Sequence, residues 1–367
     1  MTTYRKQGEY RMTKVYNFSA GPAVLPKTVL EKAQNQLLNY KQSGMSVMEM
    51  SHRSAIFEEI LEHAKAQVKE LMNIPDTHSI LFLQGGASMQ FHMLALNYAQ
   101  GKDVAYVDTG NWSQKAMDEA SRYGTVHCIA SSKDKNYSYI PEFSTDNLEK
   151  YAYLHLTTNN TLEGTAFTTL PKVNIPLILD ASSNILSYDI DVSQTALIYA
   201  GAQKNIGAAG VTMVIIRNDF ISDVKDLPPM LSYETMIKNN SLYNTPPTYG
   251  IYIAGLVFDW LQELGGVDAM IKLNTIKSNK LYDFIDHSDF YSCPVHGSDR
   301  SLTNIPFKSP NETLDAKFVK EATDKGLLNL KGHRLIGGMR ASLYNAFPLE
   351  GVDALIDFMM QFEGENH

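Results

Sequence analysis

Cysteine is scarce in this chain, since only Cys128 and Cys293 occur among its 367 residues. Two thiols are too few for a disulfide framework or for a metal cluster, and such scarcity fits a reducing cytosol. Cys128 stands in Val-His-Cys-Ile-Ala, a setting typical of a buried core thiol. We therefore expect neither a disulfide scaffold nor a metal site.

Long apolar runs and long basic runs are also missing. No stretch approaches the roughly 18 apolar residues of a membrane span, and the start of the chain has charges but no hydrophobic segment of a signal peptide. A net charge of -8 without a basic run argues against nucleic-acid binding. We expect a cytoplasmic protein with no membrane or nucleic-acid partner, in which local arginines hold any anionic ligand.

The composition that is present, 44% hydrophobic and 20% charged residues, is typical of a globular protein of a length that allows two domains. We expect residues 1–14 to be a disordered extension, with Met12 as a candidate initiator. Residues 15–266 are predicted to form a large domain, although its first residues could pack with the smaller one. Residues 267–367 are predicted to form that smaller α+β domain.

Short apolar segments alternate with helical patterns along the large domain, which predicts an α/β fold around a sheet covered on both faces. The last two strands are joined by about ten residues, too few for a crossover helix, so we expect that pair to be antiparallel. The sheet should therefore be mixed. Predicted strands are 79–83, 104–107, 126–130, 153–156, 177–179, 197–200 and 211–216, and predicted helices include 27–40, 55–72 and 249–264.

Lys204 is the only charge in a run of small residues between the last two strands, where we expect a loop at the sheet edge. Taken alone it could be a surface lysine on a glycine-rich turn, or a Schiff-base lysine that is partly desolvated. Asp180 ends the preceding strand and should face the crevice at the carboxyl edge of the sheet. Pyridoxal phosphate needs this pair, a lysine for the imine and an aspartate that keeps the pyridine nitrogen protonated.

A glycine turn follows the first strand of the sheet. The segment Gln84-Gly-Gly-Ala-Ser88 leads into an apolar helix, and a helix start with free backbone amides is a phosphate cradle. A dinucleotide fold is the alternative, because Asp108 closes the next strand. However, Gln90 stands where a third glycine belongs and the two glycines are adjacent, so a single phosphate is the preferred prediction.

Two further segments could serve a flat ring. Trp112 follows Asp108-Thr-Gly-Asn on a predicted loop, and its face could stack on a pyridinium, although a loop tryptophan is more often packing. The segment Thr158-Asn-Asn-Thr-Leu-Glu-Gly164 could supply a hydroxyl to the ring oxygen, although alone it would be interpreted as a turn.

The basic residues of interest come in two groups, His52-Arg53 early in the chain and His333-Arg334 with Arg340 late in it. Arginines near glycines are commonly solvated. In an acidic protein, two His-Arg pairs and a third arginine still indicate an anion pocket, because guanidinium forks suit carboxylate and phosphate.

Five segments together resemble the phosphoserine aminotransferase family, which is a class V family of pyridoxal phosphate-dependent aminotransferases. The resemblance runs from about Tyr16 to the C-terminus. It implies a homodimer of the aspartate aminotransferase-like fold type I, with a seven-stranded mixed sheet and pyridoxal phosphate at the dimer interface. The segments are 17–22 (NFSAGP), 48–53 (MEMSHR), 199–207 (YAGAQKNIG), 241–247 (SLYNTPP) and 332–342 (GHRLIGGMRAS).

The resemblance also implies roles for individual residues. Lys204 would carry the cofactor as its aldimine, with Asp180 on the pyridine nitrogen, Trp112 stacked on the ring and Thr161 at the ring oxygen. The implied ligands of the cofactor phosphate are Ala87, Ser88 and Gln203, with Asn244 and Thr245 from the other subunit. The implied substrate ligands are His52, Arg53, His333, Arg334 and Arg340, without an assignment of either arginine to one end of the substrate.

The chain departs from the family at three positions. Ser88 stands where some members have an arginine, which leaves the substrate pocket one positive charge fewer. Asn160 and Ala208 replace a common glutamate and a common proline, both outside the chemistry.

The implied reaction transfers the amino group of glutamate to 3-phosphohydroxypyruvate by a ping-pong mechanism, in serine biosynthesis. Action on a phosphorylated threonine analogue in vitamin B6 synthesis stays open. A desulfurase or lyase would want a reactive cysteine on a mobile loop, and neither Cys128 nor Cys293 is so placed. The missing third glycine disfavours a dinucleotide-dependent dehydrogenase, and Lys204 with Asp180 disfavours a non-catalytic homologue.

Overall fold

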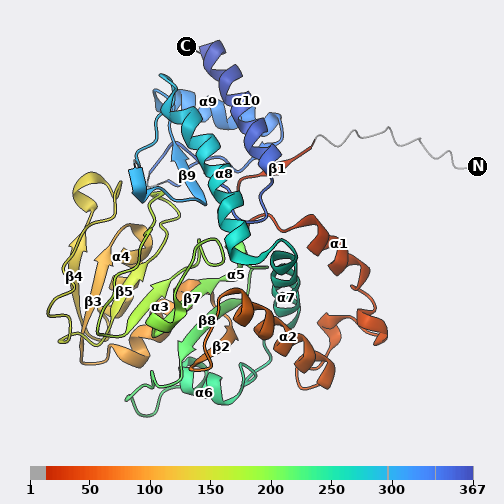
Figure 1. Cartoon of the computed structure of the whole chain (residues 1–367), viewed down its shortest axis with the longest axis vertical. Coiled ribbons are helices and arrows are strands. Elements are labelled where there is room, and N and C mark those ends of the chain that lie inside the picture. Colours follow the sequence, from red (N-terminus) through yellow and green to blue (C-terminus); the bar gives the residue numbers. More distant parts are fainter. Residues whose placement is uncertain (1–13, 296, 335, 367) are drawn as a thin grey trace, which may run out of the picture.

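A seven-stranded sheet forms the centre of the molecule, with strand order β2-β8-β7-β6-β5-β3-β4 (Figure 1). The computed structural model describes residues 14–295, 297–334 and 336–366, so the expected extension up to residue 13, with Met12, lies outside the described residues. The seven predicted strands are confirmed. They are β2 (His78–Leu83), β3 (Asp103–Asp108), β4 (Thr125–Ser131), β5 (Leu154–Thr157), β6 (Leu177–Asp180), β7 (Leu197–Gly201) and β8 (Thr212–Arg217).

One strand of this sheet runs against the others. β8 is antiparallel to both of its neighbours, β2 and β7, whereas β3, β4, β5, β6 and β7 pair in parallel. The predicted antiparallel pair around Lys204 is therefore confirmed. Because β2 runs in the same direction as β7, the segments that follow β2, β3, β5, β6 and β7 all begin at the same edge of the sheet.

Alternate residues of each strand pack into two separate apolar clusters, one on each face of the sheet. In β8, Met213 and Ile215 belong to one cluster, and Val214 and Ile216 belong to the other. Both faces are covered, which explains why the strands are apolar throughout. The covering helices are α2 (Ala55–Leu71) and α7 (Thr248–Glu263) on the first face, and α3 (Gly86–Tyr98), α4 (Asn111–Ala120) and α6 (Tyr233–Lys238) on the second.

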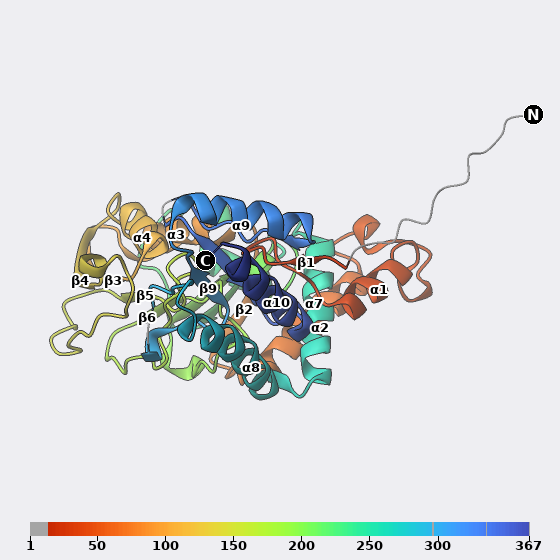
Figure 2. The ribbon, with the colours of Figure 1, turned by 90° about the horizontal axis from the view of Figure 1, so that it is seen from above.

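The C-terminal third of the chain has its own apolar cluster, which lies beyond the edge of the sheet in Figure 1. Viewed from above, α10 lies between α8 and α9 (Figure 2). β11 pairs with β9 in antiparallel fashion, and the N-terminal strand β1 (Tyr16–Asn17) pairs in parallel with β10. The other elements are α8 (Gly266–Asp286), α9 (Glu312–Asp324), α10 (Leu349–Asn366), β9 (Asn304–Phe307), β10 (Leu327–Leu328) and β11 (Met339–Ser342).

The first predicted helix is shorter than expected. It ends at Asn35 as α1 (Lys27–Asn35) rather than at Tyr40, and it buries only Val29 and Ala33, too little apolar surface to continue. The helices predicted at 55–72 and 249–264 are confirmed to within one residue at each end. None of the described helices is long and apolar enough to cross a membrane. Short 3-10 turns occur at Tyr40–Gln42, Val47–Glu49, Lys133–Lys135, Val192–Gln194, Pro229–Leu231 and Gly297–Asp299.

Candidate active site

Lys204 lies on a single helical turn, α5 (Ala202–Asn205), which follows β7 directly. The prediction of a loop around Lys204 is therefore wrong in detail. The turn forms because the carbonyl of Ala202 accepts hydrogen bonds from the backbone N–H groups of Ile206 and Gly207, at 3.2 and 2.9 Å. In Figure 1, α5 lies where the sheet meets the C-terminal elements. The lysine is thus at the carboxyl edge of a central strand.

The Lys204 amine is surrounded by residues that the sequence predicted. Its Nζ donates a 2.7 Å hydrogen bond to Oγ1 of Thr161, and it lies 5.5 Å from the centroid of the Trp112 ring. Burial lowers the pKa of Lys204 to about 8, although the negative charge of Asp180 opposes this shift. An amine with this pKa is partly neutral near pH 8 and can act as a nucleophile or base.

Trp112 is the second residue of α4 and not part of a loop, which corrects the prediction. The helix begins early because the hydroxyl of Ser113 accepts from the backbone N–H groups of Thr109 and Gly110, at 2.9 and 3.0 Å. The indole Nε1 of Trp112 is buried and has no hydrogen-bond partner within the described residues. The helix start holds the ring beside the Lys204 amine.

Asp180 is the last residue of β6 and is 5% exposed. One of its carboxylate oxygens accepts from the backbone N–H of Ser182 at 3.0 Å. Burial raises the pKa of Asp180, and the positive charge of Lys204 with hydrogen bonds from Ser182 and Tyr199 opposes that rise. Asp180 and Lys204 are therefore electrostatic neighbours on adjacent strand ends, as the sequence predicted.

The glycine turn after β2 has the backbone geometry of the predicted cradle. Gly85 has a φ of 89° and Gly86, the first residue of α3, has a φ of 67°. A Cβ atom on Gly85 would lie 2.5 Å from that of Met89, so a larger residue does not fit there. Ala87 and Ser88 lie in the first turn of α3, where free backbone N–H groups and the helix dipole favour an anion.

The N-terminal segment packs against the lysine turn. The backbone N–H of Ala23 donates to the carbonyl of Gln203 at 2.8 Å. A Cβ atom on Gly21 would lie 3.4 Å from Cγ of Lys204. Gln203 and Lys204 are thus held from outside by the motif that begins the described chain.

Arg340, on β11, brings the C-terminal elements into the site. Its Nη1 donates to the carbonyl of Thr161 at 3.3 Å, and its buried Nε has no partner among the described residues. Arg340 also lies close enough to Lys204 to lower the pKa of that amine. An arginine with a free edge beside the lysine can bind a substrate anion.

Glu163 is a residue of the site that the sequence reasoning missed. It is buried, and its Oε1 accepts from the backbone N–H of Asn111 at 2.8 Å. Burial raises its pKa, and Arg340 opposes that rise. A Cβ atom on Gly110 would lie 2.6 Å from Oε1, so glycine is required there. The available signal was that Glu163 is the only charged residue in the segment 158–164.

A cluster of positive charges lies beside Arg340. Burial lowers the pKa of His333, and the charges of Arg340, Arg334 and Lys115 lower it further. Lys115 was not predicted; it lies one turn after Trp112 on α4, with its Nζ 4.7 Å from the centroid of the Trp112 ring. The structure thus places His333 beside three cationic side chains, those of Arg334, Arg340 and Lys115.

Four predicted residues take no part in the interactions of Lys204 or Arg340 described above. His52 and Arg53 lie in the turn before α2, where Nε of the exposed Arg53 is 3.4 Å from Nε2 of His52. Asn244 and Thr245 lie beside the glycine turn, because the Thr245 carbonyl accepts from the side chain of Gln84 at 3.0 Å.

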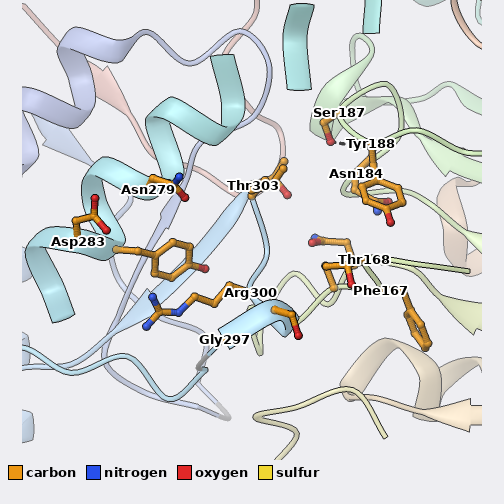
Figure 3. A pocket seen from close by; sticks show the side chains of 15 residues that line it. Phe167, Thr168, Asn184, Ser187, Tyr188, Asn279, Asp283, Gly297, Arg300 and Thr303 are labelled. Carbon is orange, nitrogen blue, oxygen red and sulfur yellow. Dashed lines mark hydrogen bonds between the residues drawn. The ribbon is translucent and has the colours of Figure 1, made fainter. Parts of the chain in front are cut away.

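A cavity of about 320 Å³ between the sheet and α8 is separate from this site (Figure 3). Asn279 and Asp283 of α8 line one side of it, Asn184 and Tyr188 line the other, and Arg300 lies between them. None of the predicted site residues lines this cavity. Thr158 connects the two, because its hydroxyl contacts Asn184, which lines the cavity, and the carbonyl of Asp180.

The residues around Lys204 fit pyridoxal phosphate. The partly neutral amine suits the aldehyde of the cofactor, and the buried carboxylate suits its ring nitrogen. The aromatic face suits the flat ring, and the glycine turn at a helix start suits the phosphate. Trp112, Glu163 and Arg340 each have a buried polar atom without a partner among the described residues, as expected where a polar group binds. The fold and the site together define a pyridoxal phosphate-dependent enzyme of fold type I.

The chain belongs to the aminotransferase class-V family, whose sequence profile matches residues 15–355. It is 58% identical over 353 residues to a phosphoserine aminotransferase of Listeria monocytogenes serovar 1/2a, a match that covers 96% of this chain and 97% of the relative. The phosphoserine aminotransferase of Bacillus circulans subsp. alkalophilus superposes with a TM-score of 0.94 at 46% identity, over 96% of this chain and 99% of the other. A phosphoserine aminotransferase with bound pyridoxal phosphate from Trichomonas vaginalis superposes with a TM-score of 0.90 at 40% identity, over 95% of this chain and 100% of the other.

Proposed function

We propose that this chain transfers the amino group of L-glutamate to 3-phosphohydroxypyruvate, giving O-phospho-L-serine and 2-oxoglutarate. The observation that carries the proposal is the convergence of Lys204, Asp180 and Arg340 on one site, in a chain 58% identical to a phosphoserine aminotransferase. The enzyme uses pyridoxal phosphate, follows a ping-pong mechanism and serves serine biosynthesis.

When bound, the cofactor supplies an electron sink for the electron pair left at the substrate Cα. Lys204 would hold its aldehyde carbon, Asp180 its ring nitrogen, Trp112 its ring face and Thr161 its ring oxygen. The phosphate ligands on this chain would be Ala87, Ser88 and Gln203. The positions of Lys204, Thr161 and Trp112 around one amine support these assignments.

Lys204 would move the proton in each half-reaction. Its lowered pKa of about 8 leaves part of the amine neutral near physiological pH. It could therefore take the Cα proton of glutamate and pass it to the cofactor in the first half-reaction, and deliver a proton to Cα of phosphoserine in the second. The Thr161 hydroxyl, 2.7 Å from Nζ, orients the amine. Asp180 would hold a proton on the ring nitrogen, because a buried carboxylate pairs strongly with a cation.

The cationic cluster would bind the substrates. Glutamate and phosphoserine each carry an α-carboxylate and a second anion at similar reach, so one set of basic residues can serve both. Arg340, His333 and Arg334 supply that set on this chain, and Lys115 adds a charge beside them. Phosphate carries more charge and more acceptor atoms than carboxylate, which should favour the phosphorylated substrate.

We also propose a cytoplasmic homodimer in which each subunit completes the site of the other. His52, Arg53, Asn244 and Thr245 do not contact Lys204 or Arg340 in the interactions described for one chain, so a second copy would have to supply them. Met89, Met230 and Asn244 line a second cavity, of about 290 Å³, and Tyr243 precedes Asn244. Met89, Met230 and Tyr243 are exposed, and exposed apolar side chains are common at interfaces. Mixing Lys204→Ala and Arg53→Ala chains should restore activity, since hybrid dimers contain one complete site. Failure of exchanged chains to regain activity would refute shared sites.

The reaction is tested by the visible absorption spectrum of the purified protein, recorded before and after addition of O-phosphoserine, with alanine and cysteine in parallel. We expect the band of the bound cofactor to change with phosphoserine alone, with release of 3-phosphohydroxypyruvate. An equal response to alanine or cysteine would exclude the proposed substrate and the anion pocket while leaving the cofactor in place. The same assay with 4-phosphohydroxy-L-threonine tests the additional role in vitamin B6 synthesis.

A further inference from the structure

A row of buried polar side chains lies behind Asp180 on one face of the sheet. Strand register pairs Asp180 of β6 with Tyr199 of β7, and pairs His155 of β5 with Ile178 of β6 and Tyr106 of β3. Paired residues on neighbouring strands point to the same face, and so do residues two apart on one strand. Asp180, Tyr199, His155 and Tyr106 therefore share the face covered by α3, α4 and α6.

A hydrogen bond connects two of these side chains, and the third lies beside them. The Tyr199 hydroxyl lies 2.8 Å from Nε2 of His155. Tyr199 lies directly opposite Asp180 in the register of β6 and β7, and it favours the charged form of that carboxylate. Both Tyr199 and His155 are fully buried, at 0% exposure, so water does not compete for their hydrogen bond.

The position of the His155 proton sets the direction in which these side chains donate hydrogen bonds. Nδ1 of His155 is buried and has no partner within the described residues, so an N–H there would be unsatisfied. The proton of the neutral imidazole therefore belongs on Nε2, which donates to the oxygen of Tyr199. The hydroxyl proton of Tyr199 is then left for the neighbouring carboxylate of Asp180, which can only accept.

His155 is unable to take up a second proton at low cost. An imidazolium would place an N–H on Nδ1, in a buried position without an acceptor. Burial accordingly lowers the pKa of His155 to about 3. The ring of Tyr106 stacks on the imidazole with centroids 4.7 Å apart, which holds the ring in place.

We propose that Tyr199 and His155 are positioning residues that act through Asp180, as a one-way donor chain from His155 to Tyr199 to the carboxylate. The chain keeps Asp180 ionised and oriented although the carboxylate is buried. This inference rests on the proposed function, because an ionised Asp180 is what would stabilise a proton on the ring nitrogen of the cofactor.

Other titratable groups lie around the Asp180, Tyr199 and His155 side chains. Lys204 on α5 faces Asp180 and also favours its charged form. Besides Asp180, three phenols face Tyr199. They are Tyr106 on β3, Tyr153 before β5 and Tyr233 on α6. Tyr106 bonds to the hydroxyl of Tyr153 at 2.8 Å and not to Asp180, so Tyr106→Phe removes a buried hydroxyl of the same face outside the chain.

The test compares Tyr199→Phe, His155→Leu and the control Tyr106→Phe as cofactor-loaded enzymes. Retention of pyridoxal phosphate during dialysis is measured across pH 5 to 9, together with the pH profile of kcat. Removing the hydroxyl donor raises the pKa of Asp180, so the acid limb of both profiles should move to higher pH in Tyr199→Phe. We expect a shift of about one pH unit, the size expected for one hydrogen bond to a charged group. His155→Leu should give a smaller shift in the same direction, and Tyr106→Phe none.

A second measurement does not depend on activity. With ring-labelled histidine, ¹⁵N NMR of the wild-type protein should show Nε2 of His155 protonated and Nδ1 unprotonated throughout pH 5 to 9. A protonated Nδ1, or a His155 signal that titrates in this range, would overturn the proposal. Unchanged pH profiles in Tyr199→Phe would also overturn it. The transaminase assignment would not be affected by that result, because it is tested by the reaction of the wild-type enzyme. If the wild type failed to transaminate phosphoserine, the NMR result would still decide the direction of the chain.

Discussion

The amine of Lys204 lies 2.7 Å from the hydroxyl oxygen of Thr161, a residue 43 positions earlier in the chain. Thr161 belongs to the segment that follows β5, and Lys204 to the turn that follows β7, so β6 lies between their strands in the sheet. Their contact exists only because parallel strands end at one edge. The same edge presents Asp180 from β6, which completes the polar part of the site.

The pH at which Lys204 loses its proton is the first prediction. Because burial lowers its pKa to about 8, the amine of the cofactor-free protein should become reactive about two pH units below a free lysine, which titrates near ~10.4. Competitive acylation followed by peptide mass spectrometry measures this midpoint. In Asp180→Asn the midpoint should fall further, since Asp180 favours the charged amine. A midpoint near 10 in the wild type would show that Lys204 is solvated.

Asp180→Asn should lower kcat/KM by about 10² to 10³-fold, the range seen when one electrostatic partner of a developing charge is removed. The amide keeps the shape of the carboxylate but not its charge, so a proton on the ring nitrogen is no longer stabilised. Asp189→Asn, which changes an exposed carboxylate nine residues later, is the matched control and should leave activity unchanged. Equal activities of the two variants would rule out the proposed role of Asp180.

Arg340→Lys should raise KM for glutamate and for phosphoserine by about tenfold, equivalent to ~1.4 kcal/mol, with a smaller effect on kcat. Lysine keeps the charge but loses the planar fork that binds carboxylate or phosphate with two hydrogen bonds. Steady-state kinetics with each substrate varied in turn measure both constants. Arg217→Lys, on β8 in an ion pair with Asp219, controls for the loss of a guanidinium elsewhere. A normal KM for both substrates would place the anion site away from Arg340.

Lys277→Met should destabilise the protein by about 3 kcal/mol, because it leaves buried carbonyl groups without a donor. Lys277 of α8 is 4% exposed, and its Nζ contacts the carbonyls of Leu343, Tyr344, Asn345 and Phe347 at 2.8 to 3.4 Å. Urea unfolding measures the change in the free energy of unfolding. Lys272→Met, at an exposed position of the same helix, should change it by less than about 1 kcal/mol.

The Lys277 substitution should also reduce activity. The backbone N–H of Asn345 donates to Oδ1 of Asn205 at 2.9 Å, and Asn205 follows Lys204 directly. A loosened segment 343–347 would therefore disturb the catalytic turn from the C-terminal side. A stable, fully active Lys277→Met enzyme would show that the carbonyl cluster is satisfied in another way.

Much of the fold and part of the site were predictable because their signals are local. Seven short apolar strands are visible as such in the sequence, and a ten-residue connection is enough to make β7 and β8 antiparallel. The pairing of Lys204 with Asp180 follows from their places at the ends of successive strands. Helix limits were less certain, and α1 ends five residues early because too few of its side chains find a buried surface.

Other residues could not be found from local patterns. Trp112 belongs to a helix because the Ser113 side chain caps its first turn, and the local sequence of glycine and polar residues also suits a loop. Lys115 lies among ordinary charged residues of an amphipathic helix. Tyr199 and His155 are parts of apolar strands, and nothing near either in sequence indicates that they meet.

The sequence alone determined the strands and helices, the chemistry of Lys204 and Asp180, and the resemblance to an aminotransferase family, since these depend on residue type and short spacing. The tertiary structure decided which charges surround the amine. Thr161 reaches Lys204 across 43 residues and Arg340 reaches Thr161 across 179, and such contacts are set by strand order and by the packing of the C-terminal elements. It also decided the buried environment that lowers the pKa of Lys204, because burial is a property of the folded chain and not of its residues.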